Sequence, residues 1–415
     1  MKKLFSLLVV LALLCVTASV FADPVKIEFW HSMGSATGEL VQQLVKEFNE
    51  SQDEVYVDCI YQGDYTTAGT KVQAAIAGGN APHVMQTELT RIGIYATQDL
   101  LLDLTPYAEN DPDFDVDALY PGLMDYSWYE GKLISLPNGR SIPVMYYNVD
   151  ALKEAGIEKA PETWDELMEA ARALTKDGSY GFGIPLGDSW YYMALVVTAG
   201  GQVFNDDETN IGFHDDGSGV KALTLWKNMM DEGIGYIPEG EDYASNAALR
   251  NAFMAGIVKM TFQSIAQYRS LSDNSPFEVG VAYIPSDVTR GYVPGGSNLI
   301  AFDGMTKEEE EACWKFMKYM CSADVAGRYA AGTGYLPTSD AALNSEAFQE
   351  KLKDYPYLDV AVGQMDIVIK MPFDEFYPEI KDNVITKYVQ ECLIGGMSPE
   401  EAVENMYVEA GEFYE

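Results

Sequence analysis

The sequence predicts an α/β fold that begins with a parallel sheet. Apolar side chains at every second position of residues 25–29 show the period of two that is typical of a strand. Apolar residues at helical spacing follow over residues 41–48, and the same succession of strand and helix repeats over residues 55–61 and 70–77. Because strands that alternate with helices pair in parallel, this order indicates the α/β class.

The loops after the first two predicted strands are the expected place for a ligand. In open α/β sheets, ligands bind beyond the carboxyl ends of the strands. Residues 30–32, Trp-His-Ser, and residues 63–65, Gly-Asp-Tyr, occupy these two loops.

Later helices carry clear local signals. Thr163 with Glu166, and Ser398 with Glu401, have the spacing of a capping box at a helix start. Residues 307–320 form an amphipathic pattern. The sequence contains no repeat and no low-complexity linker, so we expect several short crossings to join its domains.

Residues 1–22 have the three parts of a secretory signal peptide. Lys2 and Lys3 precede an apolar run over residues 4–14, and Val-Phe-Ala at residues 20–22 supplies a small-residue cleavage site. The apolar run is shorter than the roughly 18 residues of a transmembrane helix, and no later segment reaches that length.

We therefore expect an exported protein that begins at Asp23 and works in the periplasm or at the extracytoplasmic face of the cell membrane. Lipid anchoring at Cys15 is the alternative. Leu14, which precedes it, is larger than lipoprotein processing usually accepts.

Length and composition indicate a globular protein of two domains. The chain has 415 residues, of which 47% are hydrophobic and 12% aromatic, and these values exclude a disordered protein. The net charge of −37 repels nucleic acid and anionic lipid. We expect no nucleic-acid partner.

Four cysteines follow the predicted signal peptide: Cys59, Cys313, Cys321 and Cys392. Cys313 and Cys321 fall eight residues apart in one predicted helix, which separates them by about 12 Å. This distance exceeds the reach of a disulfide. Two other bridges or a set of buried thiols both remain open.

No motif indicates a metal, a cofactor or a catalytic residue. Aspartates alternate over residues 111–117 like the start of a calcium loop, but Val116 stands at the glycine position and Gly122 at the glutamate position. The histidines are isolated in the sequence at His31, His83 and His214. The sequence also has no nucleophile elbow and no phosphate-binding loop.

A series of short motifs runs through the chain in a fixed order. It comprises Phe-Trp-His-Ser-Met at 29–33, Tyr-Gln-Gly-Asp-Tyr at 61–65, Gly-Asn-Ala-Pro at 79–82, Pro-Val-Met-Tyr-Tyr-Asn at 143–148, Thr-Trp at 163–164, Phe-Met-Ala-Gly at 253–256, Gly-Gly-Ser at 295–297 and Thr-Gly-Tyr-Leu-Pro at 333–337. In this order the motifs resemble the extracellular solute-binding proteins of ABC importers, in the carbohydrate-binding family 1. The resemblance is closest to the sn-glycerol-3-phosphate-binding branch.

This resemblance implies a two-lobed clamp, the type II periplasmic-binding-protein fold, with the ligand in the cleft between the lobes. The N-terminal lobe would comprise residues 23–141 and 295–336, and the C-terminal lobe residues 142–294 and 337–415. Closure would be a hinge motion favoured by ligand that contacts both lobes. The expected partner is a membrane ABC permease, and we expect a monomer.

Five ligand contacts follow from the resemblance: Tyr65, Ser141, Ser264, Gly296 and Tyr335. A tyrosine lays its ring against carbon while its hydroxyl bonds an oxygen. The two serines are small donors for polyol or phosphate oxygens, and the Gly296 backbone N–H can serve an anion.

Four further residues are candidates. Glu88 stands one residue earlier than the acid of the branch, and Lys381 stands where the branch has an arginine, which keeps the charge but loses the bidentate fork. Arg140 either replaces part of that pairing or is solvated at the surface. Trp190 either forms a stacking wall or belongs to the core.

The leading hypothesis is a non-catalytic protein that captures sn-glycerol 3-phosphate or a glycerophosphodiester for import. A neutral mono- or oligosaccharide is the alternative, favoured by the lost arginine and the many aromatic residues. A secreted carbohydrate-active enzyme is a distant third and would need two carboxylates about 5–9 Å apart in the cleft.

Overall fold

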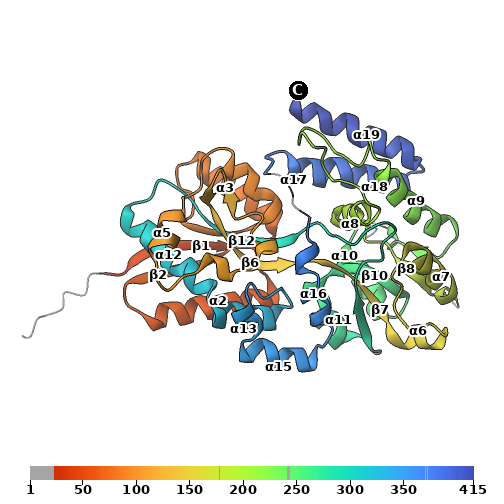
Figure 1. Ribbon diagram of the computed structural model, residues 1–415, viewed down its shortest axis with the longest axis horizontal. Helices are drawn as coiled ribbons and strands as arrows, with labels where there is room; N and C mark the ends of the chain where they lie inside the picture. Colours follow the sequence, from red (N-terminus) through yellow and green to blue (C-terminus); the bar gives the residue numbers. More distant parts are fainter. Residues whose placement is uncertain (1–22, 177, 241–243, 370, 372) are drawn as a thin grey trace, which may run out of the picture.

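A computed structural model of the chain describes residues 23–176, 178–240, 244–369, 371 and 373–415. The predicted signal peptide, residues 1–22 with Cys15, lies outside the described residues. Two α/β halves lie side by side (Figure 1), and within the described residues each half contains one five-stranded sheet.

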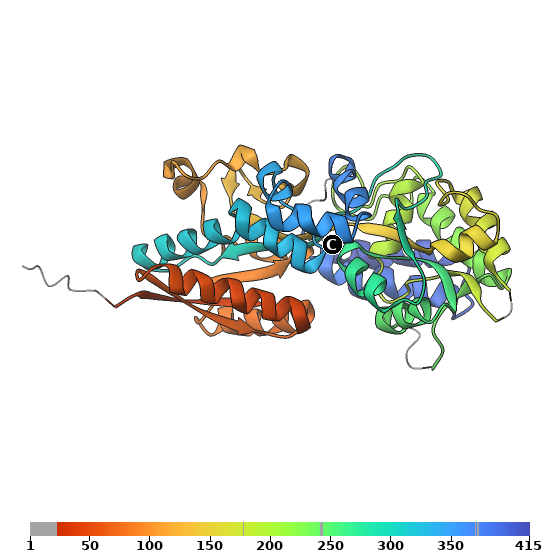
Figure 2. The same cartoon turned by 90° about the horizontal axis from the view of Figure 1, so that it is seen from below.

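The first sheet confirms the predicted parallel start. Its order is β2-β1-β3-β12-β6, with β1 parallel to both β2 and β3 and β12 antiparallel to β3 and β6. The bounds are β1 Val25–His31, β2 Val55–Tyr61, β3 Val84–Glu88, β6 Ser135–Ser141 and β12 Gly295–Ala301. The helices of this half include α2 Ser35–Ser51, α3 Tyr65–Ala77, α12 Lys307–Met320 and α13 Ala323–Thr333, and Figure 2 shows α2 running along the outside of it.

The second helix begins earlier than predicted, at Tyr65 instead of Thr70. The Asp64 carboxylate accepts a hydrogen bond from the Thr67 N–H at 2.7 Å, and this cap starts the helix directly after the turn. Tyr65, predicted to lie in a loop, is therefore the first residue of α3.

The second sheet has the order β11-β7-β10-β8-β9. Its strands are β7 Pro143–Asn148, β8 Tyr180–Gly183, β9 Gly235–Tyr236, β10 Val258–Ser264 and β11 Val279–Ala282. Helices of this half include α7 Trp164–Leu174, α8 Trp190–Thr198, α9 Ser218–Asp231, α18 Thr386–Leu393 and α19 Pro399–Gly411. Thr163 and Glu166 form the predicted capping box at α7, and the Ser398 hydroxyl caps α19 by accepting the Glu401 N–H at 3.1 Å.

The chain passes between the sheets in short connections. Only Ile142 separates β6 from β7, and residues 283–294 lead from β11 back to β12. The predicted division into residues 23–141 with 295–336 and residues 142–294 with 337–415 stays a prediction.

Buried apolar side chains of the described residues form three core clusters, one within the first half and two that span both halves. In the first half Phe29 packs edge-on against Phe316 at a ring-centroid distance of 5.0 Å. The four cysteines of the described residues are free thiols; Cys313, Cys321 and Cys392 are buried and Cys59 is half-buried. Among the described residues, no helix is both long and apolar enough to cross a membrane.

Candidate functional site

Ser141, Gly296 and Trp190 come together where the chain passes between the sheets. Ser141 ends β6 and lies opposite Gly295 at the start of β12, with Gly296 the next residue. Trp190 begins α8, and its indole Nε1–H donates to the Val293 carbonyl at 2.9 Å. A Cβ atom on Gly295 would stand only 2.4 Å from Trp190 Cζ2, so the indole packs directly on the backbone of β12.

Ser264 and Tyr335 approach the same region from two other segments. Ser264 ends β10, and its backbone N–H donates to the hydroxyl of Tyr191 in α8 at 3.1 Å. Tyr335 follows α13, and the N–H of the next residue, Leu336, donates to the Arg140 carbonyl in β6 at 2.8 Å. Both residues are half-buried.

Tyr65 and Tyr335 place two hydroxyls close together. Burial raises the pKa of Tyr65 and of Tyr335, and each ring also acts on the pKa of the other. The Tyr65 hydroxyl is buried and makes no well-formed hydrogen bond among the described residues, although the Ser297 and Tyr335 side chains lie close enough to act on its pKa. The Tyr335 ring stacks on Tyr329 at a centroid distance of 5.9 Å and an interplanar angle of 3°. Both hydroxyls stay protonated at neutral pH and can therefore donate to a ligand.

Four charged side chains form a closed ring of alternating sign. Lys381 Nζ lies 3.4 Å from Glu88 Oε1 and 2.9 Å from Asp382 Oδ1. Arg91 Nε lies 3.5 Å from Glu88 Oε2, and Arg91 Nη2 lies 3.4 Å from Asp382 Oδ2. A fifth charge, Asp188, is 3.6 Å from Lys381 Nζ. We call Glu88, Arg91, Lys381 and Asp382 the ion-pair ring.

Burial on its own would lower the pKa of Lys381, whose exposed fraction is 6%. The carboxylates of Asp188, Glu88 and Asp382 outweigh this effect and raise the pKa well above its usual value. Lys381 is therefore a permanent cation at every physiological pH.

The ion-pair ring connects the two halves of the molecule. Glu88 is the last residue of β3, directly opposite Ser297 of β12, and Arg91 lies in the short helix η1, Leu89–Arg91. Lys381 and Asp382 lie in η7, Ile380–Ile385, a π-helical turn that leads into α18. Such turns occur frequently at functional sites.

The structure thus brings all eight predicted ligand residues into one connected region, and their part in ligand binding stays a prediction. Two members of the ring, Arg91 and Asp382, and their neighbour Asp188 were not identified from the sequence. Local signals for them existed, since Arg91 falls three residues after Glu88, Asp382 directly follows Lys381, and Asp188 precedes Trp190 by two residues.

The prediction that Arg140 might be solvated is wrong. Arg140 is 1% exposed, and its Nη1 donates to the Leu123 carbonyl at 2.7 Å and to Asn298 Oδ1 at 3.2 Å. Burial lowers its pKa to about 10. Its guanidinium makes no ion pair with the ring carboxylates, so a part in ligand pairing gains no support. Trp190 is also buried, with an exposed fraction of 8%. It nevertheless lies beside the ring, because its backbone N–H donates to Asp188.

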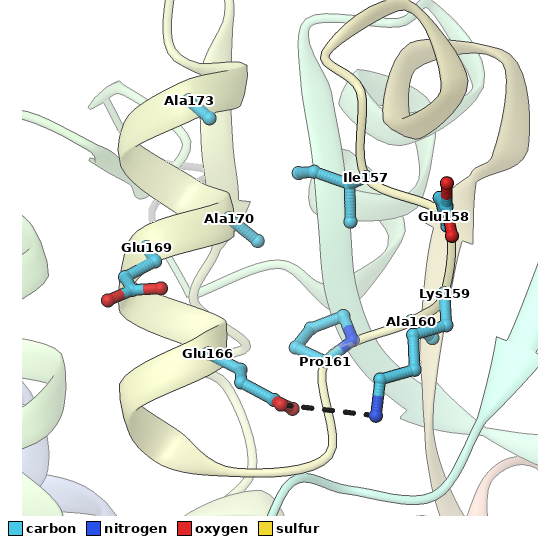
Figure 3. A pocket seen from close by; sticks show the side chains of 9 residues that line it. All are labelled: Ile157, Glu158, Lys159, Ala160, Pro161, Glu166, Glu169, Ala170 and Ala173. Carbon is cyan, nitrogen blue, oxygen red and sulfur yellow. Dashed lines mark ion pairs between the residues drawn. The ribbon is translucent and has the colours of Figure 1, made fainter.

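Open surface pockets lie elsewhere. One of them, of about 290 Å³, lies between α7 and residues 157–161. Its lining side chains are drawn in Figure 3, with the ion pair between Lys159 and Glu166, whose Nζ and Oε1 atoms are 3.9 Å apart. This pocket and four others, which are lined by described residues, contain no predicted ligand residue. Within the described residues, no three His, Cys, Asp or Glu side chains are grouped to hold a metal ion.

The chain is similar to a known protein family over most of its length. The sequence profile of the family described as bacterial extracellular solute-binding protein matches residues 43–355. The sn-glycerol-3-phosphate-binding periplasmic protein UgpB of Yersinia pseudotuberculosis is 26% identical over 405 residues, which covers 92% of this chain and 90% of that protein.

Two solved structures share the fold across almost the whole chain. The ABC substrate-binding protein Lmo0181 of Listeria monocytogenes, in complex with cycloalternan, has a TM-score of 0.83 at 24% identity and covers 94% of this chain and 99% of that one. UgpB of Mycobacterium tuberculosis, in complex with glycerophosphocholine, has a TM-score of 0.82 at 20% identity and covers 94% and 98%. These likenesses confirm the predicted two-lobed α/β clamp.

Proposed function

Because the chain belongs to the bacterial extracellular solute-binding proteins, we propose that it captures a small neutral polyol or sugar for import. Proteins of this family bind small solutes outside the cytoplasm and deliver them to an ABC permease, and they are not enzymes. The chain is therefore the extracytoplasmic solute-binding component of an ABC importer. The chemistry of the site supports the choice of ligand.

The ion-pair ring is the observation that carries this choice. Lys381 and Arg91 each contact two carboxylates of the ring, so both cations are already neutralised. A phosphate that leaves water needs cationic or strong hydrogen-bonding partners to compensate its desolvation. Asp188 adds a further negative charge beside Lys381 and makes the region less favourable for an anion.

A neutral hydroxylated ligand matches the same groups well. Carboxylates accept hydrogen bonds from hydroxyls, and the protonated tyrosines Tyr65 and Tyr335 donate to ligand oxygens. The Trp190 indole offers an apolar face for carbon atoms. Ser141, Ser264 and the backbone N–H of Gly296 complete the proposed set of contacts, with Glu88 and Lys381 contributed by the ring.

Glycerol 3-phosphate or a glycerophosphodiester is the second candidate. The Yersinia relative is named for binding glycerol 3-phosphate, and the Mycobacterium structure holds glycerophosphocholine. Lys381 is the group that would meet a phosphate. To do so it would have to give up a ring contact with Glu88 or Asp382, and that rearrangement would weaken binding.

Hinge closure fits the position of the ring. Its members come from β3 and η1 on one side and from η7 on the other, so a ligand beside the ring would contact both halves. A ligand that binds only when both halves contact it favours the closed state, and we propose that the permease recognises this state.

A thermal-shift experiment on the purified mature protein tests the ligand class. Ribitol, maltose and other polyols and sugars are compared with glycerol 3-phosphate. A ligand at about 1,000 times its Kd adds roughly 4 kcal/mol to the free energy of unfolding, which raises Tm by several degrees. We expect a rise with a neutral compound and none with glycerol 3-phosphate. A rise with glycerol 3-phosphate alone, lost in Lys381→Gln, would replace this proposal by the second candidate.

A further inference from the structure

Asp188 occupies a distinctive place beside the ion-pair ring. It lies in the loop between β8 and α8, and its Oδ1 accepts the Trp190 N–H at 3.0 Å. The same oxygen lies 3.6 Å from Lys381 Nζ. Both contacts use Oδ1, and no described residue hydrogen-bonds Oδ2. The side chain is 34% exposed, so an incoming group can reach the carboxylate.

The ion pairs around Asp188 contain one more carboxylate than cation. Arg250, which like Asp188 acts on the pKa of Tyr191, makes no ion pair with a carboxylate among the described residues and contacts Gln263 Oε1 at 3.4 Å. The ion-pair ring holds two cations and two carboxylates, and its charges cancel. Asp188 is the fifth charge and has no cation of its own, because Lys381 is shared with the ring. An anion placed against Lys381 would therefore lie within a few ångströms of Asp188, where like charges repel strongly in a partly buried site.

A second observation points to a ligand in this region. The Tyr65 hydroxyl is buried without a hydrogen-bond partner among the described residues, whereas buried polar groups are generally hydrogen-bonded. Tyr335 and Ser297, and more weakly the carboxylate of Glu88 in the ring, lie close enough to act on the pKa of Tyr65. An unfilled donor therefore lies near the ring, on the side of the first sheet.

We propose that Asp188 sets the charge specificity of the site. Its carboxylate excludes phosphate esters and other anionic solutes, and its Oδ2 accepts a hydroxyl of the neutral solute while Oδ1 holds the start of α8. This inference rests on the proposed function, because it assigns to one residue the preference for neutral ligands.

The test is a gain of binding in Asp188→Asn. Asparagine keeps the oxygen that accepts the Trp190 N–H and nearly the same shape, and it removes only the charge. Glycerol 3-phosphate and inorganic phosphate are the probes, titrated by calorimetry at low salt. We expect no measurable binding to the wild type and an affinity for glycerol 3-phosphate at least tenfold higher in the variant. Asp188→Ser, which also keeps an acceptor, should show the same gain if the asparagine variant folds poorly.

Glu50→Gln is the matched control. Glu50 lies near the end of α2 with its side chain 66% exposed, and its ion pair is with Lys46, so the substitution changes the net charge by the same amount at a residue that has no contact with the ring. An equal gain in this control, or no gain in the folded Asp188 variants, overturns the inference and leaves the proposed function standing. Tight binding of glycerol 3-phosphate by the wild type overturns the proposed function itself.

Discussion

Lys381 Nζ lies 3.4 Å from Glu88 Oε1, and this contact joins η7 to the end of β3 across the two halves of the molecule. The lysine side chain is 8% exposed and the glutamate side chain 19%. Each partner also has a second contact on its own side, Asp382 for Lys381 and Arg91 for Glu88. Separation of the halves would therefore leave neither charge unpaired, which makes the contact compatible with hinge opening.

Replacement of Lys381 by Met should destabilise the protein. Three carboxylates, Glu88, Asp188 and Asp382, then lose their shared cation. Removal of one partner of a buried ion pair lowers the free energy of unfolding by about 3 kcal/mol. Urea denaturation at pH 7 measures the loss. The double variant with Glu88→Gln should lose less than the sum of the two single variants, since one of the orphaned charges is gone. Strict additivity would show that the contact contributes nothing.

Stability should fall as the pH drops from about 6.5 to 4 because of His31. This residue is 1% exposed, and burial lowers its pKa from 6.5 to about 4, against a smaller upward effect of the Met33 backbone. Below pH 6.5 the unfolded chain takes up a proton that the folded chain does not bind, so the free energy of unfolding decreases, by about 3 kcal/mol over the whole window.

Urea denaturation between pH 7 and 4.5 checks this, with His31→Gln expected to lack that part of the decline. His214 provides a control of opposite sign. Burial would lower its pKa, but Asp215 and Glu404 raise it overall, so its contribution is present below pH 6.5 and is lost as the pH rises through its folded pKa. An identical pH slope in His31→Gln and the wild type would contradict the prediction.

The periodic spacing of apolar residues predicts the first strands and the amphipathic helix well, because that spacing depends on which face of each element is buried. Strands 25–31 and 55–61 and helix 307–320 appear where periodicity places them. The early start of α3 was missed because a single Asp64 side chain decides it. A helix boundary of this kind depends on one hydrogen bond rather than on a periodic pattern.

The candidate site is only partly predictable because its electrostatics depend on contacts between distant segments. Lys381 was identified by its position, yet its partners Glu88 and Asp188 are far away in the sequence. The burial of Arg140 likewise results from Leu123 and Asn298. The residues that flank Lys381 and Arg140 in the sequence do not indicate which distant residues contact them in the fold.

Replacement of Gly295 by Ala should weaken ligand binding through Trp190. The new Cβ would lie 2.4 Å from Trp190 Cζ2, so the indole has to shift away from β12. We expect the affinity for the neutral ligand to fall at least tenfold, with a changed near-ultraviolet circular dichroism spectrum. Gly78→Ala is the control, because its Cβ would meet ordinary contacts of 3.4 Å or more at a helix end with negative φ. Unchanged affinity in Gly295→Ala would place the ligand away from the indole.

Replacement of Tyr65 by Phe should stabilise the unliganded protein and weaken ligand binding. The hydroxyl is buried without a partner among the described residues, so its removal eliminates a desolvation penalty and adds about 1 kcal/mol to the free energy of unfolding. The ligand loses one hydrogen bond, which lowers its affinity about fivefold to tenfold.

Tyr329→Phe is the matched control, because its hydroxyl accepts a hydrogen bond from Gln86 Nε2 at 3.2 Å. That substitution should lower the free energy of unfolding by about 1 kcal/mol. Thermal denaturation with and without ligand separates the two effects. If Tyr65→Phe instead lost as much stability as Tyr329→Phe, the Tyr65 hydroxyl would be bonded within the protein, and a ligand oxygen would have no donor to meet there.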